Sequence, residues 1–320
     1  MHYDVFNGDA DGIIALLQLR LAQPRESQLI TGVKRDIKLL EHVVDAGDAS
    51  SVTVLDISME KNREALDTLL AGSVPVFYCD HHRSGELPSS NSLEALINLD
   101  AEVCTSLLIN EKLNSQYVRW AIAAAFGDNL NRVAETLAQK HHLSQAETAF
   151  LQQLGVLINY NGYGATLDDL RIAPAELFLQ LLNYPDPFAL RSDQQSPFYQ
   201  LQRGYQDDYQ QVAALKPIHQ SQAATVYELP CEAWARRISG VYGNELANQS
   251  PSQAHAVMTL NPSQADYTVS VRAPLNNRIG ADEVCSQFAT GGGRKAAAGI
   301  NALPQSEKST FIATLDAFYR

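Results

Sequence analysis

The sequence predicts an α/β protein whose larger, amino-terminal domain is built on a doubly wound parallel sheet. Three observations favour this fold class. Apolar, strand-like runs alternate with segments of helical apolar spacing between residues 3 and 79, which is the pattern of repeated βαβ units. Acidic and histidine residues follow these runs, at the strand ends where such sheets carry their sites. The length of 320 residues is sufficient for two domains.

The expected elements follow one another in order. Strands are expected at 3–6, 28–33, 52–57 and 74–79, with helices between them at 13–21, 37–46 and 59–70. Between residues 101 and 182 the spacing is mostly helical, with helices expected at 101–113, 117–126, 130–141 and 144–157. The first domain is therefore placed at residues 1–185.

A break at 183–187 separates this domain from the rest of the chain. We place a linker with an amphipathic connecting helix, at 199–215, in residues 186–221. A smaller α/β domain is expected at 222–320, with strand-like runs at 224–229, 256–260 and 267–272 and a terminal helix at 307–319.

The amino-acid composition limits the kinds of partner that the chain is expected to bind. The chain has 36 acidic and 24 basic residues, and its formal net charge is −12. Long duplex nucleic acid is bound through many lysine and arginine contacts to phosphate, so we expect no such partner. No apolar stretch approaches the roughly 20 residues of a membrane span, and the first residues lack the features of a secretory signal. We expect a cytoplasmic protein with reduced cysteines and no membrane partner, and a homodimer stays open.

Acidic and imidazole side chains gather where the apolar runs end. Four separate segments supply them: Asp9-Ala10-Asp11-Gly12, Asp56, Asp80-His81-His82 and Gly127-Asp128-Asn129. A carboxylate or an imidazole is costly at the end of a buried strand unless it has a partner, and a metal ion is the natural partner. This supply from four segments is what a centre of two metal ions requires.

Each segment alone has a structural alternative. In an extended strand end, residues i and i+2 point the same way, so Asp9 and Asp11 can face one pair of ions. An Asx-type turn with a helix N-cap accounts for the same residues. Asp56 can likewise cap a helix. The four segments together carry more weight than any one of them alone.

In this order the segments resemble the motifs of the DHH phosphoesterase family. Its four amino-terminal motifs are matched by Asp9/Asp11, Asp56, Asp80-His81-His82 and Asp128. The segment from Gly291 to Gly299, with the sequence GGGRKAAAG, resembles the glycine-rich motif of the DHHA1 domain. The resemblance spans nearly the whole chain. It implies a DHH metal-binding domain joined by the helical linker to a DHHA1 substrate-binding domain.

The resemblance also implies a role for each matched residue. Two divalent ions, bridged by Asp56, would be held by Asp9, Asp11, Asp56, His81 and Asp128. His82 would lie beside the scissile phosphate, and Asp80 would orient its neighbours. Oxygen ligands with one imidazole suit Mn²⁺ best, with Mg²⁺ or Co²⁺ as substitutes, rather than zinc. Relatives supply further ligands where Val5 and Asn7 stand here, so the first ion would have fewer protein ligands and a weaker affinity.

The second domain offers residues for the substrate. Gly291-Gly292-Gly293 lets backbone N–H groups converge on an anion, while Arg294 and Lys295 add charged donors. The alternative is a tight turn before a strand. Relatives usually have histidine in place of Arg294, and arginine there can bind a phosphate or the Hoogsteen edge of guanine. By the resemblance Arg272 would also contact substrate; its alternative is a surface arginine of a strand.

These expectations combine into a metal-dependent, nanoRNase-like phosphodiesterase. Its favoured substrates are linear dinucleotides such as pGpG or pApA, hydrolysed to mononucleotides. One alternative is an enzyme that removes the 3′-phosphate from adenosine 3′,5′-bisphosphate. Another, from a different class, is a nucleotide sensor without catalysis. A processive exonuclease is disfavoured, because it would need a basic channel with stacking aromatic side chains.

Overall fold

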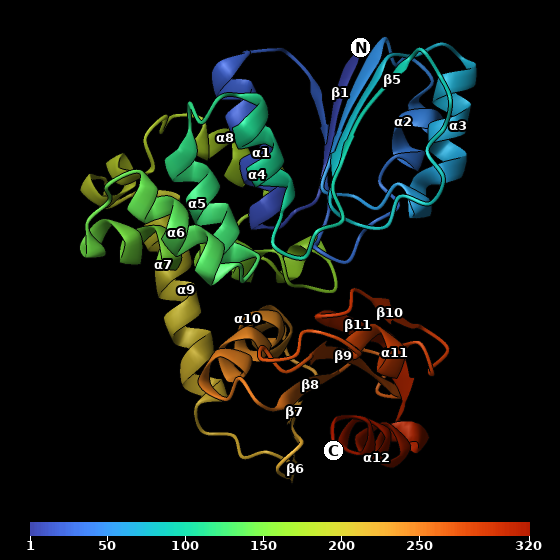
Figure 1. Ribbon diagram of the computed structural model, residues 1–320, viewed down its shortest axis with the longest axis vertical. Helices are drawn as coiled ribbons and strands as arrows, with labels where there is room; N and C mark the ends of the chain where they lie inside the picture. The colour runs from blue at the N-terminus through green and yellow to red at the C-terminus, as the bar shows by residue number, and fades with distance from the viewer. The chain divides into compact units, whose positions relative to one another are not determined.

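The computed structural model describes residues 1–320 and confirms the predicted α/β fold class (Figure 1). The chain forms two compact units, Met1–Arg203 and Gly204–Arg320. The change from one unit to the other falls inside the segment 186–221, where the sequence places a linker.

The first unit is built on a five-stranded, wholly parallel sheet in the order β2-β1-β3-β4-β5. Its strands are β1 (His2–Phe6), β2 (Gln28–Ile30), β3 (Ser51–Leu55), β4 (Val76–Asp80) and β5 (Leu93–Ile97). The edge strand β5 is missing from the predicted strands, because its residues are half-buried or exposed and form no clear period-2 pattern. The strand order reverses between β1 and β3, so a ligand site is expected at the carboxyl ends of these strands.

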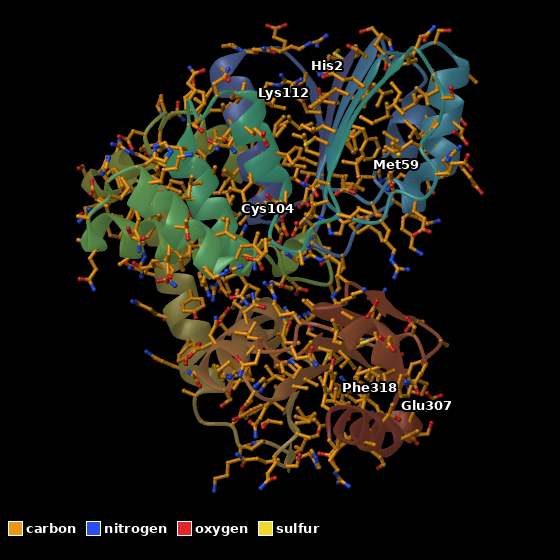
Figure 2. The ribbon with its side chains drawn as sticks, viewed as in Figure 1. His2, Met59, Cys104, Lys112, Glu307 and Phe318 are labelled. Carbon is orange, nitrogen blue, oxygen red and sulfur yellow. The ribbon has the colours of Figure 1, made fainter.

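Helices cover both faces of this sheet, as a doubly wound fold requires (Figure 1). On one face lie α1 (Ala10–Ala22) and α4 (Thr105–Lys112), and on the other α2 (Glu41–Ala46) and α3 (Arg63–Ala71). Met59 is fully buried in the core on the α2–α3 side (Figure 2). The predicted helix at 59–70 is split, because a 3₁₀ turn at Glu60–Asn62 precedes α3.

The remainder of the first unit is helical, as predicted. Its helices are α5 (Val118–Gly127), α6 (Asn131–Lys140), α7 (Gln145–Asn161), the unpredicted α8 (Pro174–Leu181) and the start of α9 (Pro197–Val212), with 3₁₀ turns at Leu167–Asp169 and Pro187–Ser192. A Cβ on Gly127 would stand 2.5 Å from the Cβ of Ala10 and 2.9 Å from the carbonyl oxygen of Gly155. Glycine at this position therefore allows the end of α5 to approach the start of α1.

The second unit contains a mixed six-stranded sheet in the order β10-β11-β9-β8-β7-β6. Its strands are β6 (His219–Gln220), β7 (Ala224–Leu229), β8 (Ala254–Leu260), β9 (Asp266–Arg272), β10 (Gly291–Gly293) and β11 (Ala297–Pro304). Its helices are α10 (Ala233–Gln249), α11 (Ala281–Cys285) and α12 (Lys308–Tyr319), the last after a 3₁₀ turn at Gln305–Glu307. β7, β8, β9 and α12 match predicted elements. α10 was not predicted, because glycine, serine and asparagine interrupt its apolar spacing.

Each unit has its own apolar core. In the first unit, Val5, Val54 and Tyr78 are fully buried in a cluster on the sheet, and in the second Val269 and Phe311 are fully buried. The four cysteines are free thiols, and three of them are buried. None of the helices combines the length and the apolar character that crossing a membrane requires.

Candidate metal centre

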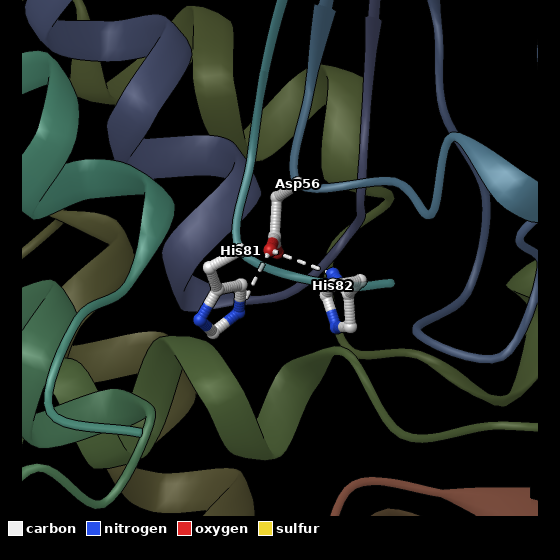
Figure 3. A group of neighbouring side chains, drawn as sticks. All are labelled: Asp56, His81 and His82. Carbon is white, nitrogen blue, oxygen red and sulfur yellow. Dashed lines mark ion pairs between the residues drawn. The ribbon is translucent and has the colours of Figure 1, made fainter. Parts of the chain in front are cut away.

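Three of the predicted site residues meet at the carboxyl ends of β3 and β4. Asp56 directly follows β3, while His81 and His82 directly follow β4. Asp56 Oδ1 lies 3.4 Å from His81 Nε2 and 3.7 Å from His82 Nδ1, and Figure 3 shows both rings beside this carboxylate. The three side chains form a group compact enough to share one metal ion.

His81 presents its Nε2 atom to this group. Its Nδ1 lies 2.7 Å from the carbonyl oxygen of Val103. A carbonyl oxygen only accepts, so Nδ1 donates this hydrogen bond and Nε2 points toward the carboxylates. Nε2 lies 3.4 Å from Asp56 Oδ1 and 3.7 Å from Asp11 Oδ2, which is longer than an ordinary hydrogen bond. The arrangement leaves Nε2 suited to binding a metal ion.

Asp56 is a buried carboxyl group whose charged form is strongly disfavoured by its surroundings. It is 2% exposed, and its backbone has a φ of 60°, in the left-handed region that aspartate tolerates better than most residues. Burial raises the pKa of its carboxyl well above the ordinary value, and the neighbouring charges of Asp11 and Asp9 raise it further. A bound cation would offset burial and the neighbouring charges, because it favours the charged carboxylate.

Asp11 joins the centre from the first turn of α1. Its two carboxylate oxygens accept the backbone N–H groups of Thr105 and Ser106, each over 2.7 Å, at the start of α4. Each carboxylate oxygen has two lone pairs, so these bonds leave acceptor capacity for an ion. The expectation that Asp9 and Asp11 share an extended strand end is wrong, because α1 begins at Ala10.

Asp9 instead caps α1, which is the alternative that the sequence left open. Its Oδ1 accepts the backbone N–H groups of Asp11 and Gly12 over 3.0 and 3.1 Å. Its other oxygen, Oδ2, is ion-paired with Lys34, a residue that the sequence does not single out. Burial alone would raise the pKa of Asp9, but the charge and hydrogen bond of Lys34, together with the Gly12 N–H, lower it below its ordinary value.

Asp128 follows α5, and its negative charge interacts with those of Asp9, Lys34 and Asp56. The predicted ligands therefore all lie in one region of the first unit. They are divided, however, between a group around His81 and a group around Lys34. Lys34 leaves little signal in the sequence, since it is a single lysine in a loop 25 residues after Asp9.

Asp80 and His82 form a hydrogen-bonded pair beside the metal candidates. His82 Nδ1 lies 2.7 Å from Asp80 Oδ1, and the side chain of His82 is 31% exposed whereas that of Asp80 is fully buried. Burial would raise the pKa of Asp80, but the charge and hydrogen bond of His82 hold it below its ordinary value. This geometry suits the predicted roles, in which Asp80 orients His82 and His82 faces a substrate.

In the second unit the glycine-rich segment forms a β-hairpin. β10 pairs antiparallel with β11, and Arg294 N donates to the carbonyl oxygen of Ala297 over 2.9 Å across the turn. A Cβ on Gly291 would stand 1.7 Å from a backbone carbonyl oxygen, whereas a Cβ on Gly292 would meet nothing within 4 Å. The tight turn before a strand, left open from the sequence, is therefore present, and anion binding stays a prediction.

The basic residues predicted to bind substrate differ in how they are held. Arg294 is half-buried and Lys295 is exposed, both in the turn of the hairpin. Arg272, at the end of β9, donates to Asn244 Oδ1 over 2.5 Å and to the carbonyl oxygen of Gly240 over 3.2 Å, both in α10. Arg272 thus ties β9 to α10, and its role toward substrate stays a prediction.

The donors in the first unit fit a divalent ion such as Mn²⁺ or Mg²⁺. They are carboxylate oxygens with one imidazole nitrogen, the combination that these ions accept. The pKa of Asp56 is raised, first by burial and then by the neighbouring carboxylates, and a bound cation would lower it. Asp80 Oδ2 is also buried without a hydrogen-bond partner.

No protein-family model matches the chain, and no curated protein matches it. Solved structures do match. The manganese-bound exonuclease RecJ is similar over 99% of this chain and 89% of its own, at 18% identity and a TM-score of 0.62. RecJ from Thermus thermophilus, in complex with Mn²⁺, has a TM-score of 0.64 and 19% identity, over 99% of this chain and 52% of RecJ.

The pGpG-specific phosphodiesterase PggH from Vibrio cholerae is similar over 100% of this chain and 99% of its own, at 12% identity and a TM-score of 0.53. At such identities these likenesses concern the fold. They confirm, over the full length of the chain, the fold that the resemblance to the DHH and DHHA1 motifs implied.

Proposed function

We propose that the chain is a metal-dependent phosphodiesterase that hydrolyses short linear oligonucleotides. The favoured substrates are dinucleotides such as pGpG or pApA, and the products are mononucleotides. The observation that carries the proposal is the group formed by Asp56, His81 and His82 at the carboxyl ends of β3 and β4 in a parallel sheet. The fold shared with a pGpG-specific phosphodiesterase and with a manganese-bound exonuclease supports it.

Mn²⁺ would be held by Asp11, Asp56 and His81, with Mg²⁺ or Co²⁺ as substitutes. His81 Nε2 lies 3.4 Å from Asp56 Oδ1 and 3.7 Å from Asp11 Oδ2, so the three candidate ligand atoms lie close together. When bound, such an ion supplies a water of lowered pKa and stabilises negative charge on the leaving oxygen. His82 is half-buried and is the most accessible member of the group, and its Nδ1 is held by Asp80. Its Nε2 would contact a phosphate oxygen of the substrate.

The hairpin of the second unit would bind the end of the substrate. Arg294 and Lys295 add positive charge at a turn, and an arginine can bind phosphate through two parallel hydrogen bonds. The net charge of −12 disfavours long nucleic acids, which need extended basic surfaces. A few local cations suffice for a substrate of two nucleotides.

A substrate panel tests this proposal. The metal-free protein is incubated with Mn²⁺ and either pGpG, pApA, longer oligonucleotides up to a 20-mer, cyclic dinucleotides or adenosine 3′,5′-bisphosphate. We expect kcat/KM to be highest for the linear dinucleotides and more than tenfold lower for the 20-mer, a difference above about 1.4 kcal/mol.

The same panel separates the alternatives. Highest kcat/KM on adenosine 3′,5′-bisphosphate would identify the 3′-phosphatase instead. Nucleotide binding without any metal-dependent turnover would identify a sensor. His81→Ala should abolish turnover, whereas His42→Ala is the matched control, because His42 is an exposed histidine on α2.

A further inference from the structure

A lysine side chain reaches into the acidic centre beside Asp9. The Nζ of Lys34 is ion-paired with Asp9 Oδ2 and donates to Asn159 Oδ1 over 3.1 Å. It also lies 5.3 Å from the centre of the Tyr163 ring. The side chain of Lys34 is 24% exposed and that of Asp9 only 5%. The ammonium is therefore largely withdrawn from water and bound on several sides.

Backbone contacts fix the position of Lys34 as well. Its N–H donates to the carbonyl oxygen of Gly162 over 2.8 Å, and its own carbonyl oxygen accepts Asn7 Nδ2 over 3.2 Å. Gly162 ends α7, the helix that also carries Asn159, and Asn7 lies just before Asp9. Lys34 is thus anchored to the segments that build the centre.

Both carboxylate oxygens of Asp9 are already occupied, one by two N–H groups and the other by an ammonium. Oδ1 accepts the N–H groups of Asp11 and Gly12, and Oδ2 faces Lys34. By contrast, His81 Nε2 lies 3.4 Å from Asp56 Oδ1 and 3.7 Å from Asp11 Oδ2, distances that leave room for an ion between these atoms. The predicted ligands therefore surround one position suited to a metal ion and one position that already contains an ammonium.

We propose that the Lys34 ammonium replaces one of the two metal ions that the resemblance implies. The chain then binds a single divalent ion, between Asp11, Asp56 and His81. The inference rests on the metal centre of the proposed function. A second divalent ion at Asp9 would meet a like charge within a few ångströms, and displacing the buried ammonium would remove it from its partners. Lys34 acts as a positioning residue that neutralises Asp9.

The number of bound ions tests this inference without any measurement of activity. The protein is stripped with EDTA, checked for folding by circular dichroism, and titrated with MnCl₂ while free Mn²⁺ is counted by electron paramagnetic resonance. We expect one ion per wild-type chain. Lys34→Met removes the charge and keeps most of the aliphatic stem, so we expect two ions per chain in this variant.

Two further variants serve as controls. Lys34→Arg keeps the positive charge and should still bind one ion. Lys38→Met removes a lysine whose side chain is 66% exposed and should also bind one ion. Two ions in the wild-type chain would overturn the inference, as would a single ion in folded Lys34→Met. If Lys34→Met does not fold, the wild-type count decides by itself.

The outcomes distinguish this inference from the proposed function. Two ions in an active wild-type chain would refute only the role of Lys34. One ion in a chain that hydrolyses no nucleotide would refute the function and leave the inference in place. A chain that binds no Mn²⁺ at all would refute both.

Discussion

Replacing Asp56 by asparagine should stabilise the metal-free protein and remove its response to metal. Asparagine keeps the shape of the side chain, can accept the hydrogen bond that Thr105 Oγ1 donates over 3.2 Å, and tolerates the left-handed backbone at a φ of 60°. The substitution therefore changes little except the charge. The variant should be more stable than the wild type without metal, yet gain no stability from metal. This combination of effects is specific to a metal site.

The magnitude follows from the distances in the centre. Oxygens of Asp56 and Asp11 lie 3.4 and 3.7 Å from the same atom, His81 Nε2, so they are at most 7.1 Å apart. Two unit charges at about 7 Å repel by roughly 2 kcal/mol when the effective dielectric constant is near 20. Removing this repulsion should raise the free energy of unfolding by about 2 kcal/mol, which corresponds to a rise in Tm of about 4–8 °C for a unit of this size.

The sign of the pH dependence follows from the pKa of Asp56, which burial and then the neighbouring carboxylates raise. A carboxyl with a raised folded-state pKa costs no stability below its unfolded pKa of about 4. The cost grows as the pH rises toward the folded-state pKa. The gain from Asp56→Asn should therefore be small near pH 4 and larger at pH 8.

Thermal unfolding in EDTA and in excess Mn²⁺ is the assay. At 100 times Kd, Mn²⁺ should stabilise the wild-type chain by about 3 kcal/mol and leave Asp56→Asn unchanged. Asp67→Asn is the matched control, because the side chain of Asp67 is 50% exposed. An Asp56→Asn variant that is less stable than the wild type in EDTA, or that gains as much from Mn²⁺, would refute the reasoning.

Three further predictions concern other parts of the chain. Burial would raise the pKa of Asp4, but hydrogen bonds from His2, Arg20 and Ser27, together with the Arg20 charge, lower it to about 2. Its carboxylate should therefore contribute about 2 kcal/mol above pH 4, which is lost as the pH falls to 2, and chemical denaturation of Asp4→Asn at pH 7 and 2 checks this. Gly291→Ala should lower Tm by several degrees while Gly292→Ala does not, because only the first Cβ meets a backbone oxygen, at 1.7 Å. Arg294→Ala should raise KM for phosphorylated dinucleotides; if the arginine contacts guanine, the loss for pGpG exceeds that for pApA by about 1–3 kcal/mol, and steady-state kinetics on both substrates decide.

Much of the first unit could be predicted because each of its buried strands is a short, continuous apolar run in the sequence. β1, β3 and β4 are apolar runs, and their carboxyl ends in a parallel sheet meet at one edge. This is why Asp56, His81 and His82 could be placed together before the fold was known. β5 lies at the edge, has no continuous apolar face and left no such signal.

The arrangement within the centre depends on contacts between distant segments. Asp9 and Asp11 are two residues apart, yet one caps α1 and pairs with Lys34 while the other accepts N–H groups from α4. Lys34 also meets Asn159, which is 125 residues away. No local pattern encodes such a contact, so the division of the ligands into two groups could be found only in the folded chain.

The central claim is that the strand ends of the first unit form a metal centre. Anomalous diffraction at the manganese absorption edge, from crystals of the protein with Mn²⁺, tests it most directly. The account predicts a strong peak at coordination distance from His81 Nε2 and from the carboxylates of Asp56 and Asp11. A strong peak elsewhere, or no peak at this position from crystals in saturating Mn²⁺, would contradict it.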